Sequence, residues 1–415
     1  MPVNAATPPD WRGPLAATLT VQIGSALLSR LIPTLGPVFT AALSLPVSAV
    51  GYFAAVATVG SILFMLAGTP LIRRQGSIRS LQIGVAVGAV GIAALMVPIW
   101  LAAALGAGLL GFGYGVTAPA SSAILQRFAP PSHRNLMFSI KQAGVPVGGV
   151  VAGLTLPALH DAIGWNGTMA AAVLLSAAIL FAIQPLRKSV DAGRDRGQVM
   201  GLTTLVSPGN LVTPLRAVWR RPDLARIGLA GSGLAATQGC WFAFLVTFLV
   251  DAMDYSLALA GLVFAAMQAV SIFGRVFLGF VSDRVGSGLV TLRHAALAGG
   301  LASAALALTG PAWPLAWVLA LAIFAGIAVS SWNGVQLAEV ARRAPRGELV
   351  ECSAGGTVLV FIGYVLGPMG FSIIVDLGGG YALAFGACAA TSFAASVAMA
   401  RIPPGINDTA PAARA

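Results

Sequence analysis

The stretch "GFVSDRVG", Gly279–Gly286, is a short polar run between two long apolar segments. A similar run, "GTPLIRRQG", occupies Gly68–Gly76, with Arg73 at the position that Asp283 holds in the later copy. Sliding the chain against itself by 210 residues superimposes the closing glycines of the two copies, residues 76 and 286. The chain is therefore built from two related halves.

The composition is that of a membrane protein. Of the 415 residues, 57% are hydrophobic and 9% are charged, and the mean hydropathy is +0.88. An ordinary soluble domain has about 25% charged residues. Cys240, Cys352 and Cys388 lie far apart inside apolar segments, without the spacing of a metal or redox site. The sequence therefore predicts neither a metal site nor a disulfide.

Twelve apolar runs approach the ~20 residues that an α-helix needs to cross a bilayer. The first six predicted spans are 15–42, 47–72, 80–99, 101–125, 136–159 and 168–186. The second six are 224–250, 257–281, 289–308, 313–338, 350–375 and 381–400. The expected fold class is an all-α membrane protein with twelve transmembrane helices in two six-helix bundles.

Positive charge predicts the orientation of these helices. Among the loops, Lys and Arg fall on alternate ones, such as the loop that holds Arg73, Arg74 and Arg79, and the opposite loops carry none. Excess positive charge marks the cytoplasmic side. Both termini should therefore lie inside, in a multi-pass protein of the inner (plasma) membrane. This topology accounts for the net charge of +11, so the lipid bilayer is the expected partner and nucleic acid is not.

The predicted domains follow from the spans. They are a cytoplasmic N-terminus (1–14), a first bundle (15–186), a cytoplasmic linker rich in Gly, Arg, Ser and Pro (187–223), a second bundle (224–400) and a cytoplasmic tail (401–415). Parallel six-helix repeats build transporters whose site lies where the two halves meet. We expect such a site here, in a monomer.

Three motifs carry a resemblance to a known family. "GRVFLGFVSDRVG", Gly274–Gly286, resembles a loop signature of the major facilitator superfamily: Gly, three residues, Asp-Arg, one residue, Gly. "KQAGVPVGG", Lys141–Gly149, and "GYVLGPMG", Gly363–Gly370, resemble its Gly-Pro helix motif. The resemblance covers essentially the whole chain. It implies a secondary transporter that works by alternating access, and hundreds of substrates share this architecture.

The superfamily also suggests a role for the two loop copies. There the loop Asp lies near the start of a helix in the opposite half and keeps the cytoplasmic side closed. Here the first-half loop should face the start of helix 350–375, which is acidic, so we hypothesise the same latch with its signs exchanged. The alternative is that these residues are only topogenic arginines and glutamates that favour their own helix end. The latch candidates are Arg73, Arg74, Asp283, Arg284, Glu348 and Glu351.

Three basic residues lie well inside predicted spans, away from the span ends: Arg30, Lys141 and Arg275. An ionisable group costs at least ~2.5 kcal/mol near the bilayer centre, so such residues usually face a cavity. Arg30, near mid-membrane, is the first candidate to contact an anionic substrate, because a guanidinium binds a carboxylate or phosphate bidentately. A structural ion pair or a carbonyl partner is the alternative. Arg275 resembles the substrate-carboxylate Arg of monocarboxylate and oxalate carriers, or belongs to a structural Gly-Arg pair. Lys141 faces the cavity or extends toward the cytoplasm.

Neutral polar residues in the same helices complete the candidate site. They are Tyr114, Gln142, Gln238 and Asn333, and Asn333 interrupts an apolar helix within "SSWNG". Each of them is otherwise explained as a helix-helix hydrogen bond.

No Asp or Glu falls in the middle of any span. A positive site without a carboxylate suits a small organic anion, carried with a proton or in exchange for another anion. A drug or metabolite exporter is the alternative, although such exporters usually keep a buried carboxylate. A minor alternative is a sensor that binds a ligand without transporting it. No nucleotide-binding Gly loop precedes Lys-Ser or Lys-Thr, so neither enzyme activity nor a cofactor is expected.

Overall fold

The structure is a computed structural model that describes residues 11–130, 133–201, 207–345 and 348–402. Every regular element among these residues is a helix. The first half contains α1 (Arg12–Ser29), α2 (Leu31–Thr34), α3 (Gly36–Ala42), α4 (Ala49–Ala67), α5 (Thr69–Gln75), α6 (Ser77–Ala94), α7 (Trp100–Gly115), α8 (Thr117–Phe128) and α9 (Arg134–Ile183). The backbone of α9 leaves the helical region at Gly164, where φ is 69°, so α9 covers two predicted spans.

The linker and the second half follow. The linker contains η2 (Gln184–Leu186), α10 (Arg187–Val190), η3 (Asp191–Gly193) and α12 (Pro208–Trp219). The second half contains α13 (Pro222–Asp251), α14 (Leu257–Val285), α15 (Gly288–Ala307), α16 (Leu315–Ala328), α17 (Asn333–Arg343), α18 (Leu349–Ile374), η4 (Val375–Gly379) and α19 (Gly380–Ala400).

Nine helical stretches of the described chain are long and apolar enough to cross a membrane. Two of them, 136–193 and 349–400, contain two predicted spans each. The first predicted span, 15–42, is not among the nine, and the structure divides it into α1, α2 and α3. The predicted all-α membrane fold is confirmed, while the count of twelve crossings and the cytoplasmic termini stay predictions.

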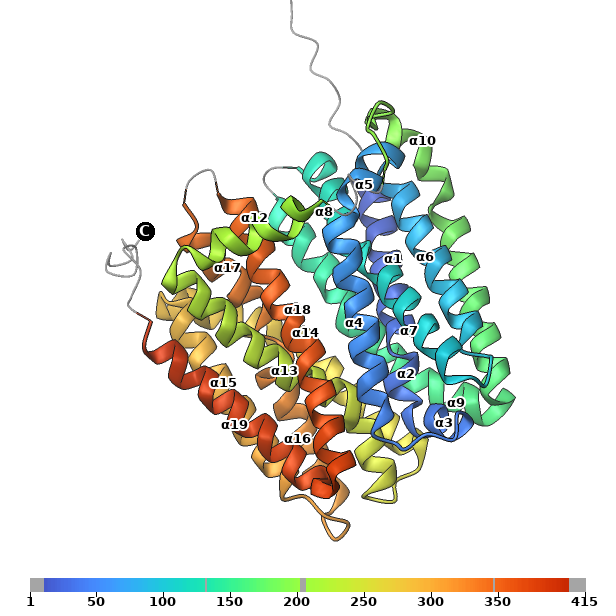
Figure 1. The fold of residues 1–415 in the computed structure, drawn as a ribbon, viewed down its shortest axis with the longest axis vertical. Helices are drawn as coiled ribbons and strands as arrows, with labels where there is room; N and C mark the ends of the chain where they lie inside the picture. The colour runs from blue at the N-terminus through green and yellow to red at the C-terminus, as the bar shows by residue number, and fades with distance from the viewer. Residues whose placement is uncertain (1–10, 131–132, 202–206, 346–347, 403–415) are drawn as a thin grey trace, which may run out of the picture.

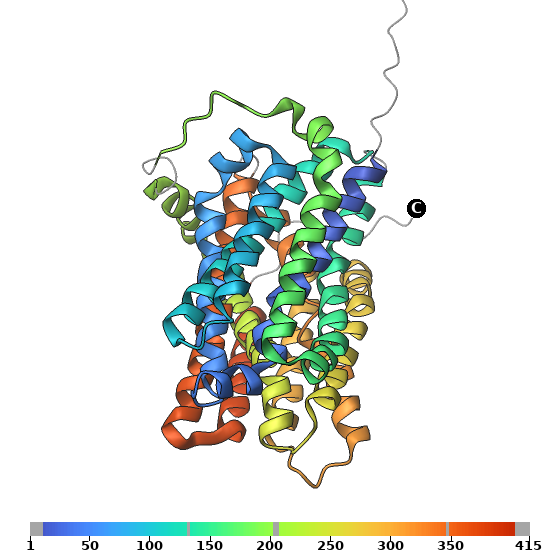
Figure 2. The same ribbon diagram turned by 90° about the vertical axis from the view of Figure 1, so that its right-hand side faces the viewer.

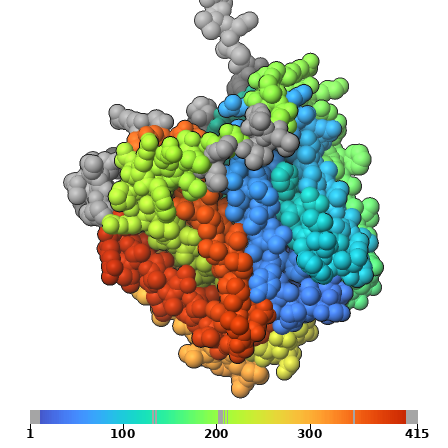
Figure 3. Space-filling view, in the orientation of Figure 1, coloured from blue at the N-terminus to red at the C-terminus, as the bar shows by residue number. Residues whose placement is uncertain are grey.

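The two halves lie side by side, with α10 and α12 of the linker at the upper end of Figure 1 and α3 at the lower end. Figure 2 shows the green linker passing over that same upper end. In the space-filling view, the orange α18 and the blue α4 abut along the boundary between the halves (Figure 3). The predicted topology makes the upper end cytoplasmic and the lower end the outer one.

Three hydrogen bonds join the halves at the outer end. Tyr52 donates to Asp376 Oδ2 at 2.7 Å, Ser48 donates to Asp376 Oδ1, and Ser372 donates to the Ser48 carbonyl at 2.7 Å. We call these four residues the outer contact. Their hydrogen bonds join the two halves at the end that the predicted topology makes the outer one.

A close approach of two glycines brings α9 and α14 together across the boundary. A Cβ atom on Gly261 would lie 2.3 Å from the Gly153 carbonyl oxygen, so any side chain at Gly261 would collide with backbone. Small residues of this kind let membrane helices pack at short distance. Backbone atoms therefore set the separation of α9 and α14 at this point.

Candidate functional site

Breaks in three helices place polar side chains at mid-length. The first break separates α1 from α2 at Arg30, three residues before Pro33. Because proline has no amide hydrogen, the carbonyl of Ser29 cannot accept the usual helical bond from residue 33. At the same break, the Arg30 amide bonds to the Leu27 carbonyl, three residues back, at 2.9 Å. This tighter pattern is typical of a helix end.

The other two breaks fall at corresponding places in the two halves. One lies between α7 and α8 at Val116, two residues after Tyr114. The other lies between α16 and α17, just before Asn333. At the break between α16 and α17, side chains donate to carbonyl groups that have lost their helical partners. Ser331 donates to the Gly326 carbonyl at 2.8 Å, and the Trp332 indole donates to the Val329 carbonyl at 2.9 Å. Transporters commonly build their sites at interrupted helices of this kind.

Arg30 lies among aromatic and cationic groups from both halves. Its guanidinium carbon lies 4.2 Å from the ring centroid of Phe242 in α13, which gives a cation–π contact across the boundary. Tyr114 of the first half and Tyr364 and Arg275 of the second half lie within electrostatic reach of Arg30. The Nε atoms of Arg30 and Arg275 are both buried without a hydrogen-bond partner. Neither arginine forms an ion pair with a carboxylate of the described chain.

A neutral hydrogen-bond network adjoins this pair of cations. The Tyr364 hydroxyl donates to Gln238 Oε1 at 2.7 Å, and Asn333 Nδ2 donates to the Tyr364 oxygen at 3.1 Å and to Gln238 Oε1 at 3.4 Å. Asn333 Oδ1 is buried without a donor. Tyr364 thus connects the amides with the two arginines, because it also lies within electrostatic reach of both.

These residues form what we call the central polar cluster: Arg30, Tyr114, Gln238, Phe242, Arg275, Asn333 and Tyr364. Five of the seven were predicted from the sequence. Tyr364 and Phe242 were missed. Tyr364 had a signal, since it is a polar aromatic inside the apolar "GYVLGPMG" motif, whereas Phe242 looks like any packing residue of an apolar helix.

Lys141 and Gln142 stand apart from this cluster. Lys141 is buried in α9, and its Nζ atom lies 3.3 Å from Oε1 of the neighbouring Gln142, which is itself exposed. No hydrogen bond or ion pair between described residues joins either side chain to the central polar cluster. Their role in substrate binding stays a prediction.

The latch candidates lie at the predicted cytoplasmic end, and no ion pair between described residues joins them across the two halves. Glu348 is exposed at the start of α18, and Glu351 Oε2 is buried without a hydrogen-bond partner. Arg73 and Arg74 are exposed, and no ion pair within the described ranges joins them to these glutamates. Asp283 is exposed as well, and Arg284 lies over the Phe280 ring at 4.9 Å. The exchanged-sign latch therefore stays a prediction for a state closed on the cytoplasmic side.

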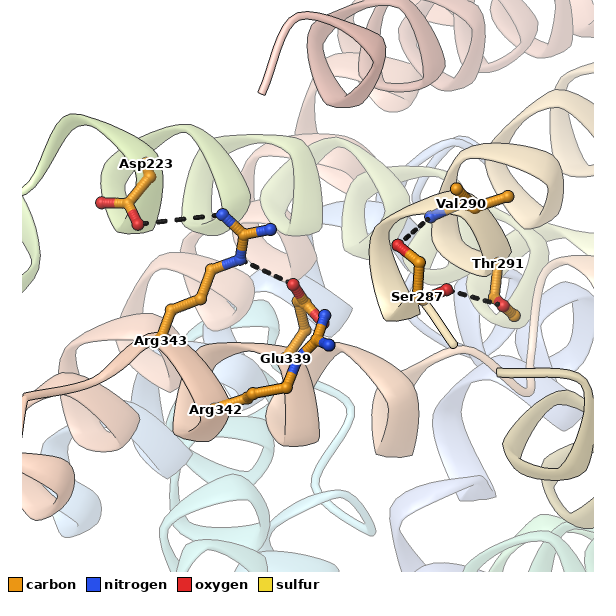
Figure 4. Close-up of polar contacts among 7 residues, drawn as sticks. All are labelled: Asp223, Ser287, Val290, Thr291, Glu339, Arg342 and Arg343. Carbon is orange, nitrogen blue, oxygen red and sulfur yellow. Dashed lines mark hydrogen bonds and ion pairs between the residues drawn. The ribbon is translucent and has the colours of Figure 1, made fainter. Parts of the chain in front are cut away.

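One acidic residue near the cytoplasmic end is fully paired. Glu339 in α17 bonds Arg342 at 2.5 Å and Arg343 at 2.6 Å, and Arg343 also lies 3.9 Å from Asp223 of α13 (Figure 4). Residues four apart on a helix lie on the same face, and Glu339 and Arg343 form their ion pair at this spacing. The pair is buried, however, rather than lying on a helix surface, because Glu339 is only 2% exposed.

The central polar cluster is suited to binding. Two guanidinium groups and a set of amides and hydroxyls offer charge and hydrogen bonds to a ligand between the halves. Within the described ranges, no group of three His, Cys, Asp or Glu could hold a metal ion. Two helical halves with such a cluster at their boundary have the architecture of a membrane transporter.

The comparison with known sequences gives the family. The family model "Major Facilitator Superfamily" matches residues 15–354, and the chain belongs to this superfamily of transporters. An uncharacterised MFS-type transporter of Mycobacterium tuberculosis is 26% identical over 291 residues, which are 68% of this chain and 61% of that protein. The match thus spans about three-fifths of the relative's length.

Solved transporter structures share the fold. The nucleoside transporter NupG has a TM-score of 0.76 at 16% identity, covering 94% of this chain and 100% of that one. A peptide transporter POT in complex with sulfate has a TM-score of 0.76 at 14% identity, covering 94% of each. A bacterial homologue of the human lysosomal transporter Spinster, inward-facing and unoccupied, has a TM-score of 0.67 at 18% identity, covering 93% and 94%. At these identities the likeness concerns the fold alone.

Proposed function

We propose that the protein moves a small organic anion of the carboxylate type across the inner membrane by alternating access. The observation that carries this proposal is the Arg30 guanidinium, which lies against Phe242 of the opposite half at 4.2 Å and has no carboxylate partner in the described chain. A charge partly removed from water without a counter-ion is costly. An anion bound at Arg30, within electrostatic reach of Arg275, would supply that counter-ion.

The rest of the central polar cluster supports the same substrate class. Tyr364, Gln238 and Asn333 are neutral, so the cluster carries net positive charge. Asn333 Oδ1 lacks a donor and suits a hydroxyl or amine on the same substrate. Because one cation belongs to each half, a bound anion would favour states in which the halves approach each other.

Thermal unfolding of the detergent-purified protein tests the substrate class. Organic acids should stabilise the wild type by about 2.7 kcal/mol at 100 times their dissociation constant, and Arg30→Gln should abolish this effect. Arg226→Gln is the matched control, since Arg226 is exposed in α13. If only cationic or neutral drugs stabilise the wild type, the exporter alternative replaces the anion carrier.

Reconstituted liposomes test the coupling. Anion exchange predicts uptake of labelled acid only into vesicles that contain unlabelled acid. Proton symport predicts uptake into empty vesicles, driven by a proton gradient. Binding without flux in both assays would contradict transport and favour a ligand sensor.

A further inference from the structure

A carboxylate of the linker caps a helix of the first half. Asp191, in η3, is 2% exposed, and its Oδ1 and Oδ2 atoms accept the backbone amides of Ile78 and Arg79, each at 2.9 Å. These amides lie in the first turn of α6, where helical partners are missing. Gly76, the residue before α6, has no side chain to cap them. The cap therefore comes from 113 residues further along the chain.

The linker around Asp191 is fastened to the first half at several points. A Cβ atom on Gly76 would lie 2.3 Å from the Asp191 carboxyl carbon, so only glycine leaves room for the carboxylate. We call residues 190–198 the linker clip. Its further hydrogen bonds are Arg127 Nη1 to the Val190 carbonyl (3.1 Å), Asp195 amide to the Arg73 carbonyl (3.0 Å) and Arg74 Nη1 to the Gln198 carbonyl (3.4 Å).

The second half also has a carboxylate beside the start of the corresponding helix, α15. That carboxylate comes from the half itself and not from the linker. The offset that superimposes Gly76 on Gly286 also places Ile78 on Gly288, at the start of α15. A Cβ atom on Gly288 would lie 2.6 Å from Glu339 Oε2, so the carboxylate of α17 lies beside that helix start. At the offset that aligns the ends of α8 and α17, Glu339 corresponds to Ile124, which is apolar. The first half thus lacks its own acid, and the linker supplies one.

We propose that Asp191 is a positioning residue for the cytoplasmic loop Gly68–Gly76. Through Asp191, the linker clip holds this loop, with Arg73, where it meets the start of α18 when the cytoplasmic side closes. The loop has no acid of its own and reaches the clip through its backbone and through Arg74. Loss of the carboxylate would free both the start of α6 and the loop before it. The inference rests on alternating access but not on the nature of the substrate.

Cross-linking tests the position of the loop. Arg73→Cys and Glu351→Cys, joined by a short bifunctional maleimide, should cross-link in membrane vesicles as the protein cycles. Adding Asp191→Ala should slow this reaction about tenfold, the order of effect of losing a helix cap. Asp195→Ala is the matched control: among the described residues its carboxylate bonds only the Gly197 amide, and its contact with Arg73 is made by the backbone. An equal rate in Asp191→Ala, or no cross-link in the parent, would overturn the proposal.

Hydrogen exchange gives an independent readout of the cap. The amides of Ile78 and Arg79 should exchange about tenfold faster in Asp191→Ala than in Asp195→Ala. If Asp191→Ala does not fold, Asp191→Asn keeps the size and one acceptor and should show the same changes at smaller amplitude. Unchanged exchange in the variant that folds would rule out the cap.

Both measurements are made without an anion. If organic acids stabilise Arg30→Gln as much as the wild type, the substrate proposal is therefore wrong, and the proposed role of Asp191 is unaffected. Conversely, unchanged cross-linking in Asp191→Ala would remove the positioning role and leave the anion carrier standing.

Discussion

The hydroxyl of Tyr52 in α4 donates a 2.7 Å hydrogen bond to Asp376, which lies 324 residues later in η4. The two residues belong to different halves, so we expect their contact to be lost when the halves separate at this end. Asp376 also accepts a hydrogen bond from Ser48. One carboxylate therefore receives two of the hydrogen bonds that close the outer end.

Asp376→Ala should open the outer side more often. Each hydrogen bond contributes about 0.5–1.5 kcal/mol, so the loss of two corresponds to an increase of about tenfold in the open population. The reporter is Thr247→Cys, a buried position against Gly36 where the halves meet. Its labelling by an impermeant maleimide should accelerate accordingly. Asp254→Asn, at an exposed site of the same face, should leave the rate unchanged.

Phe242→Leu should weaken anion binding. The ring holds the Arg30 guanidinium at 4.2 Å, and a partly desolvated cation–π contact contributes about 1–2 kcal/mol. The dissociation constant of a stabilising organic acid, measured by titration of the thermal shift, should rise about tenfold. Phe273→Leu is the control, because Phe273 is 74% exposed on α14. Equal affinity in both variants would mean that Phe242 does not position Arg30.

Tyr364→Phe should destabilise the second half. The change removes the hydroxyl that donates to Gln238 at 2.7 Å and leaves a buried acceptor with one long bond from Asn333. An unsatisfied buried polar group costs about 1–3 kcal/mol. Unfolding in mixed micelles should show this loss. Tyr255→Phe should show none, since the Tyr255 hydroxyl has no hydrogen bond to a described residue.

Glu339→Gln should also destabilise the protein. Glu339 is 2% exposed and pairs with Arg343 at 2.6 Å, and breaking a buried ion pair costs about 3–5 kcal/mol. The double variant with Arg343→Gln should lose less free energy of unfolding than the two single variants together. Additive losses would show that the pair contributes nothing. Asp283→Asn, at an exposed acid, should change stability little.

Helix positions could be predicted because the bilayer sets the length of an apolar run. The span expected at 224–250 is α13, Pro222–Asp251, and the span expected to begin at residue 257 is α14, which begins at Leu257. What the length of a run does not show is a break inside it. The first span, predicted as one helix, is interrupted at Arg30, three residues before Pro33.

The site was predictable where a polar residue stands out in an apolar helix. Arg30, Arg275 and Asn333 carry that signal, because burying them needs an explanation. Phe242 carries none, since its role depends on which helix packs opposite. Asp191 was missed for the reverse reason: a carboxylate is ordinary in a polar linker, and only the packing of α6 against η3 shows that it is buried.

The glycine contact between α9 and α14 has a mechanical consequence. Gly153 and Gly261 touch through backbone atoms, so no change of rotamer can widen or narrow their distance. We expect the halves to rotate near this point more readily than they separate there. In alternating access by such a rotation, widening at one end of the molecule would narrow the other end. A methyl group added at Gly261 should shift this point and alter the opening at both ends.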